Sequence, residues 1–495
     1  MKLSELFGRA ELTYPPALGD LEIEDIATDS RRVRKGSLYV CIRGLHVDGH
    51  EKIGEAIANG AAVIVAESVR DVFVGGAAAI YVENTRSVTA RLYHAWYGNP
   101  ARHLKIVGVT GTNGKTSIAW MLSRLFTALG IRCGLIGTVR CESAGRMLDG
   151  RSTDVMSNMT TPDPEVLYRL LAEMVRDGVT HVFMEVTSHA LALGKCDAIF
   201  FDMAVFTNLT QDHLDFHGSM EAYFQAKERL FSMCRRAVVC IDDEAGQKIY
   251  QKSKEYAVSC SQMREADYTA TDIKTDEGDG CRYMWQTPQG TFPLFVPLAG
   301  KFSVINSLQA AAVACEYGIS ADRVAFALSN IEPVPGRMER ILAGNACGIE
   351  VLIDYAHTPD ALEKLLQSTG RREGRLIVVF GCGGERDRSK RREMAHTACR
   401  FADFVIVTSD NSRGESPEQI FCDIMRGIDK ERPHILIPDR REAIRYAIAQ
   451  ARRGDTVVLA GKGHEKYEIS ADGRHPFDER VIAEEAIREY GEPRT

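Results

Sequence analysis

The sequence predicts an α/β protein of three domains, and three observations lead to that prediction. Short apolar runs rich in β-branched residues alternate with amphipathic helical stretches along the whole chain. The length is 495 residues, which at about 150 residues per domain suggests about three domains. Turn residues and prolines interrupt the alternation at two places, near 97–100 and 333–336.

The apolar runs are interpreted as buried parallel strands, because they are short and mostly bounded by Gly, Thr or Asp. In such folds the functional sites lie at the carboxyl ends of the strands. The predicted strands are 61–65, 105–109, 181–184, 376–380, 404–407 and 456–459.

The two interruptions give domains of residues 1–97, 98–333 and 334–495. An amphipathic helix ends at Tyr97-Gly98-Asn99-Pro100, and a helix predicted over Ser320–Ile331 ends before two prolines. The more polar stretch Ala266–Pro297 has a β-like pattern and is predicted to be a hairpin inserted in the middle domain.

Composition excludes several classes of protein. The 45% hydrophobic and 26% charged residues are ordinary globular usage, so most of the chain is not intrinsically disordered. A net charge of −7 argues against a protein that coats nucleic acid. No secretory leader or membrane-length apolar stretch is present, and the 13 scattered cysteines show no disulfide or zinc spacing. We therefore expect a cytoplasmic protein with mostly buried thiols.

The sharpest local signal is the segment VGVTGTNGKTS at 107–117, where a strand runs into a glycine turn that opens a helix at Ser117. Such a turn directs backbone N–H groups toward phosphate oxygens, and the helix N-terminus adds positive potential. Lys115 can reach the outer phosphates, and the Thr116 hydroxyl can bind Mg²⁺. The spacing departs from the strict GxxxxGK[ST] pattern, because Val109 stands where that pattern has its first glycine. The segment predicts an enzyme that uses a nucleoside triphosphate.

This loop alone leaves kinase, GTPase, motor and ligase open, although the N-K-x-D guanine motif of G proteins is absent. The motifs that follow decide between them, because together with GTNGKTS they resemble the Mur ligase family. They are MEVTSH at 184–189, TNLTQDHLDFHG at 207–218, YFQAK at 223–227, LAGKF at 298–302 with Asn306, PGRME at 335–339, DYAHTPD at 354–360 and GKGHE at 461–465.

Members of this family are ATP-dependent amino-acid-adding enzymes of bacterial peptidoglycan precursor synthesis. The resemblance implies a central P-loop ATPase-type parallel sheet and a C-terminal Rossmann-like domain. It assigns the first domain to the UDP-substrate, the middle domain to ATP and the third to the incoming amino acid. The segments Asp29–Val33, Asp48-Gly49 and Asp410–Arg413 resemble the branch that extends UDP-N-acetylmuramoyl-L-alanyl-D-glutamate with a diamino acid, usually meso-2,6-diaminopimelate.

The chemistry implied by the resemblance has two steps: the γ-phosphoryl group moves to a substrate carboxylate, and the amine of the amino acid then attacks the acyl phosphate. Lys115, Glu185, His213 and Lys227 are the implied catalytic residues, and Thr116, Glu185, His213 and a carbamylated Lys227 are the implied Mg²⁺ ligands. A carbamate would replace a repelled ammonium with an anion beside the metal. The implied ATP-binding residues are Gly111, Thr112, Asn113, Gly114, Lys115, Thr116, Ser117, Asn306, Arg337 and Asp354, with His357 at the border of the nucleotide.

The remaining implied residues bind the two other substrates. Those for the UDP-substrate are Thr28, Ser30, Leu45, His46, Val47, Thr160, Thr161, Thr187 and Lys195. Those for the diamino acid are Arg386, Asp410, Asn411, Ser412, Arg413, Gly461 and Glu465. Arg413 can pair with a second carboxylate and Glu465 can accept from an ammonium, which suits diaminopimelate. Ser412 stands where the family usually has proline, so L-lysine or another diamino acid stays an alternative.

Two other functions stay open at this point. One is a folylpolyglutamate-type ligase with the same ATPase core, against which the N-terminal Asp-Ser-Arg segment argues. The other is a regulatory module that binds nucleotide without turnover, against which the presence of Lys115, Glu185, His213 and Lys227 argues. A monomer without nucleic-acid partners is expected.

Overall fold

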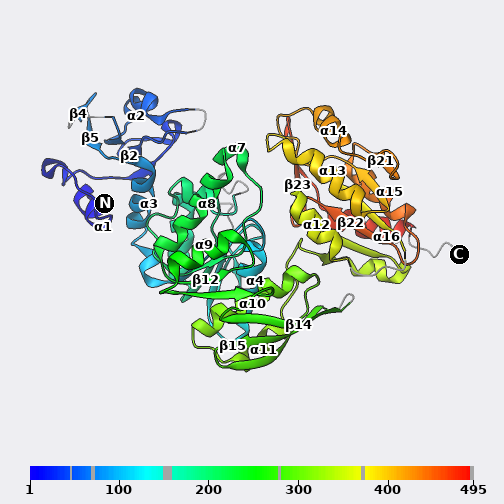
Figure 1. Cartoon of the computed structure of the whole chain (residues 1–495). Coiled ribbons are helices and arrows are strands. Elements are labelled where there is room, and N and C mark those ends of the chain that lie inside the picture. Colours follow the sequence, from blue (N-terminus) through cyan, green and yellow to red (C-terminus); the bar gives the residue numbers. More distant parts are fainter. Residues whose placement is uncertain (45–46, 69–72, 149–158, 277–279, 370–373, 491–495) are drawn as a thin grey trace. The chain divides into compact units, whose positions relative to one another are not determined.

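The computed structural model describes residues 1–44, 47–68, 73–148, 159–276, 280–369 and 374–490 (Figure 1). The chain forms two compact units. The first contains Met1–Thr110, Ile131–Ala204 and Ala226–Arg236, and the second contains Gly111–Gly130, Val205–Gln225 and Ala237–Thr495. Each unit is described by itself.

The first unit begins with a five-stranded sheet in the order β1-β2-β3-β5-β4. The strands β1 (Asp25–Ala27), β2 (Ser37–Val40), β3 (Val63–Ala66) and β5 (Ala77–Tyr81) are parallel, and β4 (Phe73–Val74) is antiparallel. Helices α1 (Leu3–Arg9), α2 (Ile53–Ala58) and α3 (Thr85–Trp96) accompany it. The Asn84 side chain caps α3 by accepting from the Ser87 amide, and α3 ends before Tyr97 as predicted.

The rest of the first unit carries a second set of parallel strands. Strand β10 (His181–Glu185) lies between β6 (Lys105–Thr110) and β7 (Cys133–Ile136) and is parallel to both. Two short antiparallel strands, β8 (Cys141–Ser143) and β9 (Arg146–Met147), follow β7. Helices α5 (Pro164–Arg176) and α6 (Ser188–Ala192) connect this part, and β11 (Phe201–Phe206) and α8 (Met220–Glu228) contribute residues to both units. The strands predicted at 105–109 and 181–184 are confirmed.

In the second unit, α4 (Lys115–Ala128) packs with α10 (Lys301–Glu316) and α11 (Ala321–Ser329). Helix α11 confirms the helix predicted at 320–331. The short helix α7 (Leu214–His217) and α9 (Glu244–Ser253) also belong here. Strand β12 (Cys234–Cys240), which also has residues in both units, pairs in parallel with β13 (Ala257–Ser261).

The prediction of an inserted two-stranded hairpin at 266–297 is wrong in its number of strands. Three strands lie there, β14 (Tyr268–Asp276), β15 (Gly280–Thr287) and β16 (Gly290–Val296), paired antiparallel in sequence order. Strand β14 also pairs in parallel with β13, so the stretch extends an existing sheet. Alternation of polar and apolar residues shows that a segment forms a strand, but it does not reveal which strand lies beside it.

The C-terminal part of the second unit is a sheet in the order β17-β18-β22-β19-β20-β21. Its parallel strands are β18 (Glu350–Asp354), β22 (Thr456–Ala460), β19 (Leu376–Phe380), β20 (Phe404–Val407) and β21 (His434–Leu436), and the edge strand β17 (Glu339–Arg340) is antiparallel. The predicted strands at 376–380, 404–407 and 456–459 are confirmed.

Helices cover both faces of this sheet (Figure 1). Val378 belongs to one core with α12 (Pro359–Gln367), α13 (Ser389–Phe401) and α14 (Pro417–Met425), whereas Ile377 belongs to another with α15 (Arg440–Gln450) and α16 (Glu479–Tyr490). The sheet is therefore doubly wound, as the Rossmann-like prediction requires. A small hairpin, β23 (Tyr467–Ser470) with β24 (Gly473–Pro476), follows β22.

Two sequence expectations concern the chain as a whole. Cys422 is exposed and the other cysteines are buried or half-buried thiols, as predicted. Within the described part of the chain, no helix is both long and apolar enough to cross a membrane.

Candidate active site

The glycine turn at 111–114, which we call the phosphate loop, joins the strand-forming segment before it to α4. Helix α4 begins at Lys115, two residues before the predicted start at Ser117. The Lys115 ammonium folds back over the loop and donates to the carbonyls of Gly111 (2.9 Å) and Thr112 (2.7 Å). Its charge therefore lies over the turn, where an anionic phosphate would replace those carbonyls as partner.

A second segment, 207–210, holds the phosphate loop in place. The Thr112 amide donates to the Asn208 carbonyl (2.8 Å), and the Asn113 amide donates to the Asn208 side chain (3.0 Å). The Thr112 hydroxyl accepts from the Thr210 amide (2.9 Å). Asp360, at the start of α12, accepts from the Asn113 side chain (2.9 Å). Asn208 and Asp360 belong to motifs quoted above, but nothing in the sequence pattern connects them with the loop.

Of the residues predicted to bind ATP beyond this loop, Asn306 and Arg337 lie beside it. Gly114 has a left-handed φ of +88°, and a side chain there would lie 2.7 Å from the Asn306 amide oxygen. Arg337 donates to the Thr116 hydroxyl (3.2 Å), and its guanidinium lies 4.6 Å from the centre of the Tyr355 ring.

Asp354 and His357 are more strongly engaged by the protein itself. The two carboxylate oxygens of Asp354 accept from the Met338 and Ala356 amides, each at 2.7 Å, and burial raises the pKa of this carboxyl. His357 contacts the Tyr355 carbonyl through Nδ1 (2.9 Å). Burial lowers the pKa of His357 to about 4, with the charge of Lys390 adding to the effect, so its imidazole is neutral near pH 7.

The predicted metal ligand His213 follows a buried carboxylate. His213 has a left-handed φ of +54°, and its amide donates to Asp212 (2.9 Å). The His213 Nε2 atom lies 3.4 Å from the other Asp212 oxygen. Burial opposes ionisation of Asp212, but His213, His357 and Lys390 lower the pKa of Asp212 to about 2. Asp212 is therefore an anion that orients the imidazole.

Two further predicted metal ligands, Glu185 and Lys227, belong to the first unit and are both buried. Glu185 ends β10, and its carboxylate accepts from the Thr138 amide (2.7 Å) and hydroxyl (3.1 Å). Lys227, which composition alone would place on an exposed helix face, is only 1% exposed. Among the described residues, no group of three or more His, Cys, Asp or Glu side chains could hold a metal ion. The predicted set contains two such residues and draws on both units, so the metal site stays a prediction.

The residues predicted to bind the UDP-substrate also lie in the first unit. Thr28 is half-buried, Ser30 is buried and Val47 is exposed, and Leu45 and His46 lie outside the described residues. A bidentate ion pair between Arg32 and Glu165 (2.8 and 2.9 Å) joins the segment after Ser30 to α5.

The four residues of this group between 160 and 195 make hydrogen bonds or ion pairs within the first unit. The Thr161 hydroxyl donates to the Glu185 carbonyl (2.9 Å), and the Thr187 hydroxyl caps α6 by accepting from the Ala190 amide (3.1 Å). Thr160 contacts the Thr138 hydroxyl at 2.9 Å, and Lys195 pairs with Asp163 at 2.8 Å. Their part in substrate binding stays a prediction.

The residues predicted to bind the diamino acid follow the carboxyl ends of β19, β20 and β22 and meet at one edge of the C-terminal sheet. The Asn411 side chain donates to Glu465 (2.8 Å). Lys462, for which the sequence predicted no role, is fully buried and donates to the Asn411 side-chain oxygen (3.0 Å). Its ammonium also lies 3.6 Å from Glu465 and 3.9 Å from Asp410.

Burial and the charges at this edge of the sheet shift the pKa values of two carboxyl groups, Glu465 and Asp410, in opposite directions. Burial raises the pKa of Glu465, and the neighbouring Asp410 raises it further. For Asp410 burial acts in the same direction, but Lys462 and Arg440 outweigh it and lower the pKa. Gly461 has a left-handed φ of +119°, and a side chain there would lie 2.8 Å from the Asp410 carboxylate. Glycine thus lets the chain pass close to Asp410.

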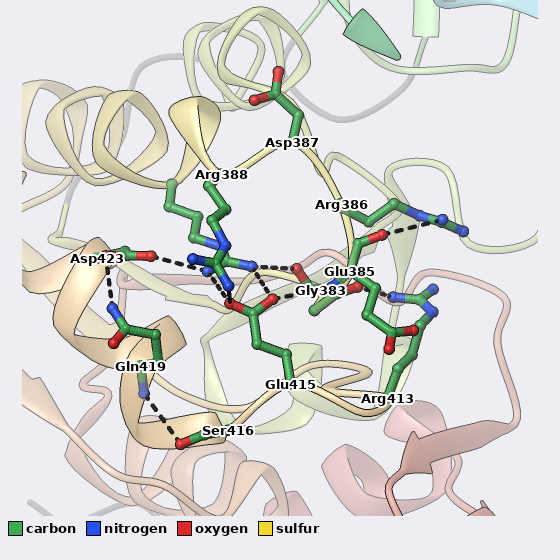
Figure 2. A network of polar contacts seen from close by, with 12 residues as sticks. Gly383, Glu385, Arg386, Asp387, Arg388, Arg413, Glu415, Ser416, Gln419 and Asp423 are labelled. Atoms are coloured by element: carbon green, nitrogen blue, oxygen red, sulfur yellow. Dashed lines mark hydrogen bonds and ion pairs between the residues drawn. The ribbon is translucent and has the colours of Figure 1, made fainter. Parts of the chain in front are cut away.

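Arg386 and Arg413 come from neighbouring loops and extend to the same side of the view in Figure 2. The Arg413 guanidinium donates to the carbonyls of Gly384 (2.9 Å) and Asn411 (3.2 Å), and Arg386 is exposed. Arg413 adopts a left-handed φ of +53° after the buried Ser412. Burial and the charge of Arg386 lower the pKa of Arg413. A guanidinium held by neutral carbonyls next to a second cation can receive a carboxylate.

Comparison with known proteins agrees with this arrangement. Three family models match the chain: "Mur ligase family, catalytic domain" over residues 22–106, "Mur ligase middle domain" over 109–314 and "Mur ligase, glutamate ligase domain" over 336–463. Two curated relatives are named UDP-N-acetylmuramoyl-L-alanyl-D-glutamate–2,6-diaminopimelate ligase. The protein from Geobacillus kaustophilus is 42% identical, covering 96% of each chain, and that from Clostridioides difficile is 40% identical, covering 98% of this chain and 99% of its own.

A solved structure of a protein with the same name is 31% identical to this chain. It superposes with a TM-score of 0.68 and covers 99% of both chains.

Proposed function

The chain is a member of the Mur ligase family, and we propose that it is the ATP-dependent ligase that adds meso-2,6-diaminopimelate to UDP-N-acetylmuramoyl-L-alanyl-D-glutamate. The reaction belongs to peptidoglycan precursor synthesis and forms one amide bond at the cost of one ATP.

In the first step a carboxylate oxygen of the UDP-substrate attacks the γ-phosphorus of ATP, and the bond to the ADP oxygen breaks. Both reactants are anions, so the residues chiefly position them and offset their charge. The Lys115 ammonium, which lies within 2.9 Å of the loop carbonyls, and the N-terminus of α4 supply positive charge here. Arg337, which donates to the Thr116 hydroxyl, adds a second cation near the start of α4.

Mg²⁺ is the metal that suits this step, because its preferred ligands are hydroxyl, carboxylate and carbamate oxygens. The Thr116 hydroxyl, the Glu185 carboxylate and a carbamate on Lys227 are such ligands, and His213 adds an imidazole. When bound, the ion would offset the charge of the phosphates and of the acceptor carboxylate. Lys227 is buried, and a carbamate on its amine would place an anion, rather than an ammonium, beside the cation.

In the second step the amine nitrogen of the diamino acid attacks the carbonyl carbon of the acyl phosphate. The amide bond forms, inorganic phosphate leaves and the nitrogen loses a proton. Arg413 and Arg386 are the proposed partners of the carboxylate at the far end of diaminopimelate. Glu465 and Asp410 are the proposed acceptors for its ammonium.

The observation that carries this choice of substrate is the placement of Arg413, whose guanidinium is held by two backbone carbonyls. A second carboxylate on the incoming amino acid gives this guanidinium a charged partner, and lysine has none to offer. The names of the full-length relatives point to the same amino acid and do not favour a folylpolyglutamate-type ligase.

Phosphate release measured with each substrate omitted in turn tests the proposal. We expect release to require ATP, Mg²⁺, UDP-N-acetylmuramoyl-L-alanyl-D-glutamate and diaminopimelate together. If the accepting carboxylate of the UDP-substrate carries ¹⁸O, one labelled oxygen must appear in the phosphate, because that oxygen bridges carbon and phosphorus in the acyl phosphate. Unlabelled phosphate, or release without the UDP-substrate, would contradict the mechanism.

A further inference from the structure

Behind the two arginines of the amino-acid site lies the side chain of Glu415, which no motif singled out. Its largely buried carboxylate accepts from both terminal nitrogens of Arg391, at 2.8 and 2.7 Å, and from the Glu385 amide at 3.0 Å. Arg388 pairs with the same carboxylate at 2.8 Å. Three donor groups thus meet on one anion (Figure 2).

Arg391 joins this carboxylate to two further parts of the domain. It comes from α13, and its side chain is 0% exposed. The guanidinium also donates to Asp423 of α14 (3.0 Å) and to the Gly383 carbonyl (3.3 Å). We call Glu415 and Arg391 the clamp. A buried ion pair with this many hydrogen bonds holds its segments in one geometry, because moving either partner would leave a charge buried without its counterion.

The clamp holds the two loops that carry the predicted amino-acid ligands. Glu415 lies two residues after Arg413, and the Glu385 amide that it accepts from belongs to the residue just before Arg386. The loops also meet directly, because the Gly384 amide donates to the Asn411 carbonyl (2.9 Å) and Arg413 donates to the Gly384 carbonyl (2.9 Å). A small displacement at Glu415 therefore changes the position of both guanidinium groups.

The two loops carry arginines that repel each other, and the clamp holds the loops together against that repulsion. Arg386 and Arg413 carry the same charge and extend to the same side, away from Glu415 (Figure 2). Like charges at short range repel, and without a bound carboxylate between them the repulsion favours separation of the loops. An anion placed behind the loops and bonded to both counteracts that separation without occupying the space where a substrate would lie.

We propose that Glu415 and Arg391 are positioning residues that set the spacing of Arg386 and Arg413, and through it the preference for an amino acid with a second carboxylate. The inference rests on the function proposed above and adds two residues to it. Neither residue touches the substrate; both act through the loops.

Glu415→Gln and Glu415→Asp test the proposal, with Asp455→Asn as the matched control. Asp455 is equally buried in the same domain, and its carboxylate also accepts from an arginine, Arg375 (2.7 Å), and from backbone amides. It precedes β22, at the opposite end of the strand from Gly461. Loss of Asp455 therefore removes a similar ion pair without touching the amino-acid loops.

The measurements are kcat and KM for diaminopimelate, lysine, ATP and the UDP-substrate, together with Tm. For Glu415→Gln we expect KM for diaminopimelate to rise about 10-fold or more, and the ratio of kcat/KM for diaminopimelate to that for lysine to fall by a similar factor. KM for ATP stays within about 2-fold of wild type, since the phosphate loop does not contact the clamp. Asp455→Asn lowers Tm but leaves the ratio unchanged.

Glu415→Asp keeps the charge and shortens the side chain by one methylene, so it should fold where Gln does not and give a smaller change of the same sign. Wild-type KM and selectivity in either folded Glu415 variant, with only Tm reduced, would overturn the positioning role. A wild-type enzyme that does not use diaminopimelate would instead contradict the proposed function.

Discussion

The phosphate loop and the amino-acid site lie in the same unit but are held together by different interactions. The phosphate loop is fixed mainly by backbone groups and neutral side chains, such as the contacts of Thr112 and Asn113 with Asn208, and one carboxylate, Asp360, joins them. The amino-acid site is fixed by ionised side chains, above all Glu415 with Arg391 and Lys462 with Glu465. The first kind of site depends on chain geometry, and the second depends on charge.

The difference follows from what each site has to bind. A triphosphate has many oxygens and is bound well by converging amides, which a tight turn and a helix N-terminus supply without side chains. A diamino acid has both signs of charge on a short chain, so it needs cations and anions at set positions. Charged groups buried for that purpose require counterions of their own.

The largest effect is expected for Lys115→Ala. Loss of the Lys115 ammonium should lower turnover by about 10³-fold, because the transferred phosphoryl group loses a charge partner in the transition state. Binding of the UDP-substrate, measured by calorimetry, should survive, since its predicted ligands lie in the first unit. Loss of that binding in a folded variant would contradict the assignment of the domains to separate substrates.

Lys227→Ala tests whether phosphoryl transfer also depends on an ionised group that lies outside the phosphate loop. We expect turnover to fall by about 10²-fold or more, because the carbamate that supports the metal can no longer form. High bicarbonate should not restore activity, whereas a small carboxylic acid such as acetate should restore part of it. Near-normal activity of the Lys227→Ala variant without any additive would contradict a role for the carbamate.

Arg413→Ala removes the guanidinium that is proposed to pair with the second carboxylate of diaminopimelate. A buried charge pair that loses one member weakens binding by about 2–5 kcal/mol, which is roughly 30-fold or more in kcat/KM for diaminopimelate. The preference over lysine should narrow, but the variant need not use lysine well, because a lysine pocket needs contacts of its own. An unchanged ratio of kcat/KM for the two amino acids would show that Arg413 is not the selector.

Acid should loosen the amino-acid loops before the phosphate loop. Hydrogen bonds from Arg391 lower the pKa of Glu415 from 4.5 to about 2, so its stabilising effect is complete above pH 4.5 and is lost as the pH falls toward 2. Hydrogen exchange from pH 5 to 3 should therefore show falling protection at 383–387 and 411–416, with less change at 111–117. Glu415→Gln should lack this pH dependence in the two loops; a profile equal to that of wild type would contradict the charge-based account.

The same contrast explains what the sequence could predict. The strand at 105–110 and the phosphate loop follow from local pattern, because periodicity and turn residues act between near neighbours in the chain. The individual strands of the C-terminal sheet follow from the same local pattern, whereas its Rossmann-like arrangement is implied by the resemblance to the Mur ligase family. The extra strand in 268–296 was missed, since pairing depends on which strand lies alongside.

The supporting contacts of the sites could not be predicted in this way. Asp360 lies 247 residues from Asn113 and Glu415 lies 24 residues from Arg391, and neither spacing matches a local motif. Lys462 stood within a quoted motif, but a lysine in a glycine-rich turn is usually exposed, and only the fold shows that it is buried between carboxylates.

The most direct test of the central claim is a competition for the enzyme's product. Wild-type protein is supplied with ATP, Mg²⁺, UDP-N-acetylmuramoyl-L-alanyl-D-glutamate and equal concentrations of meso-diaminopimelate, lysine and ornithine, and the UDP-tripeptides are separated by mass. We predict that the diaminopimelate product exceeds each of the others by about 30-fold or more. Equal amounts of the lysine product, or no tripeptide at all, would contradict the account.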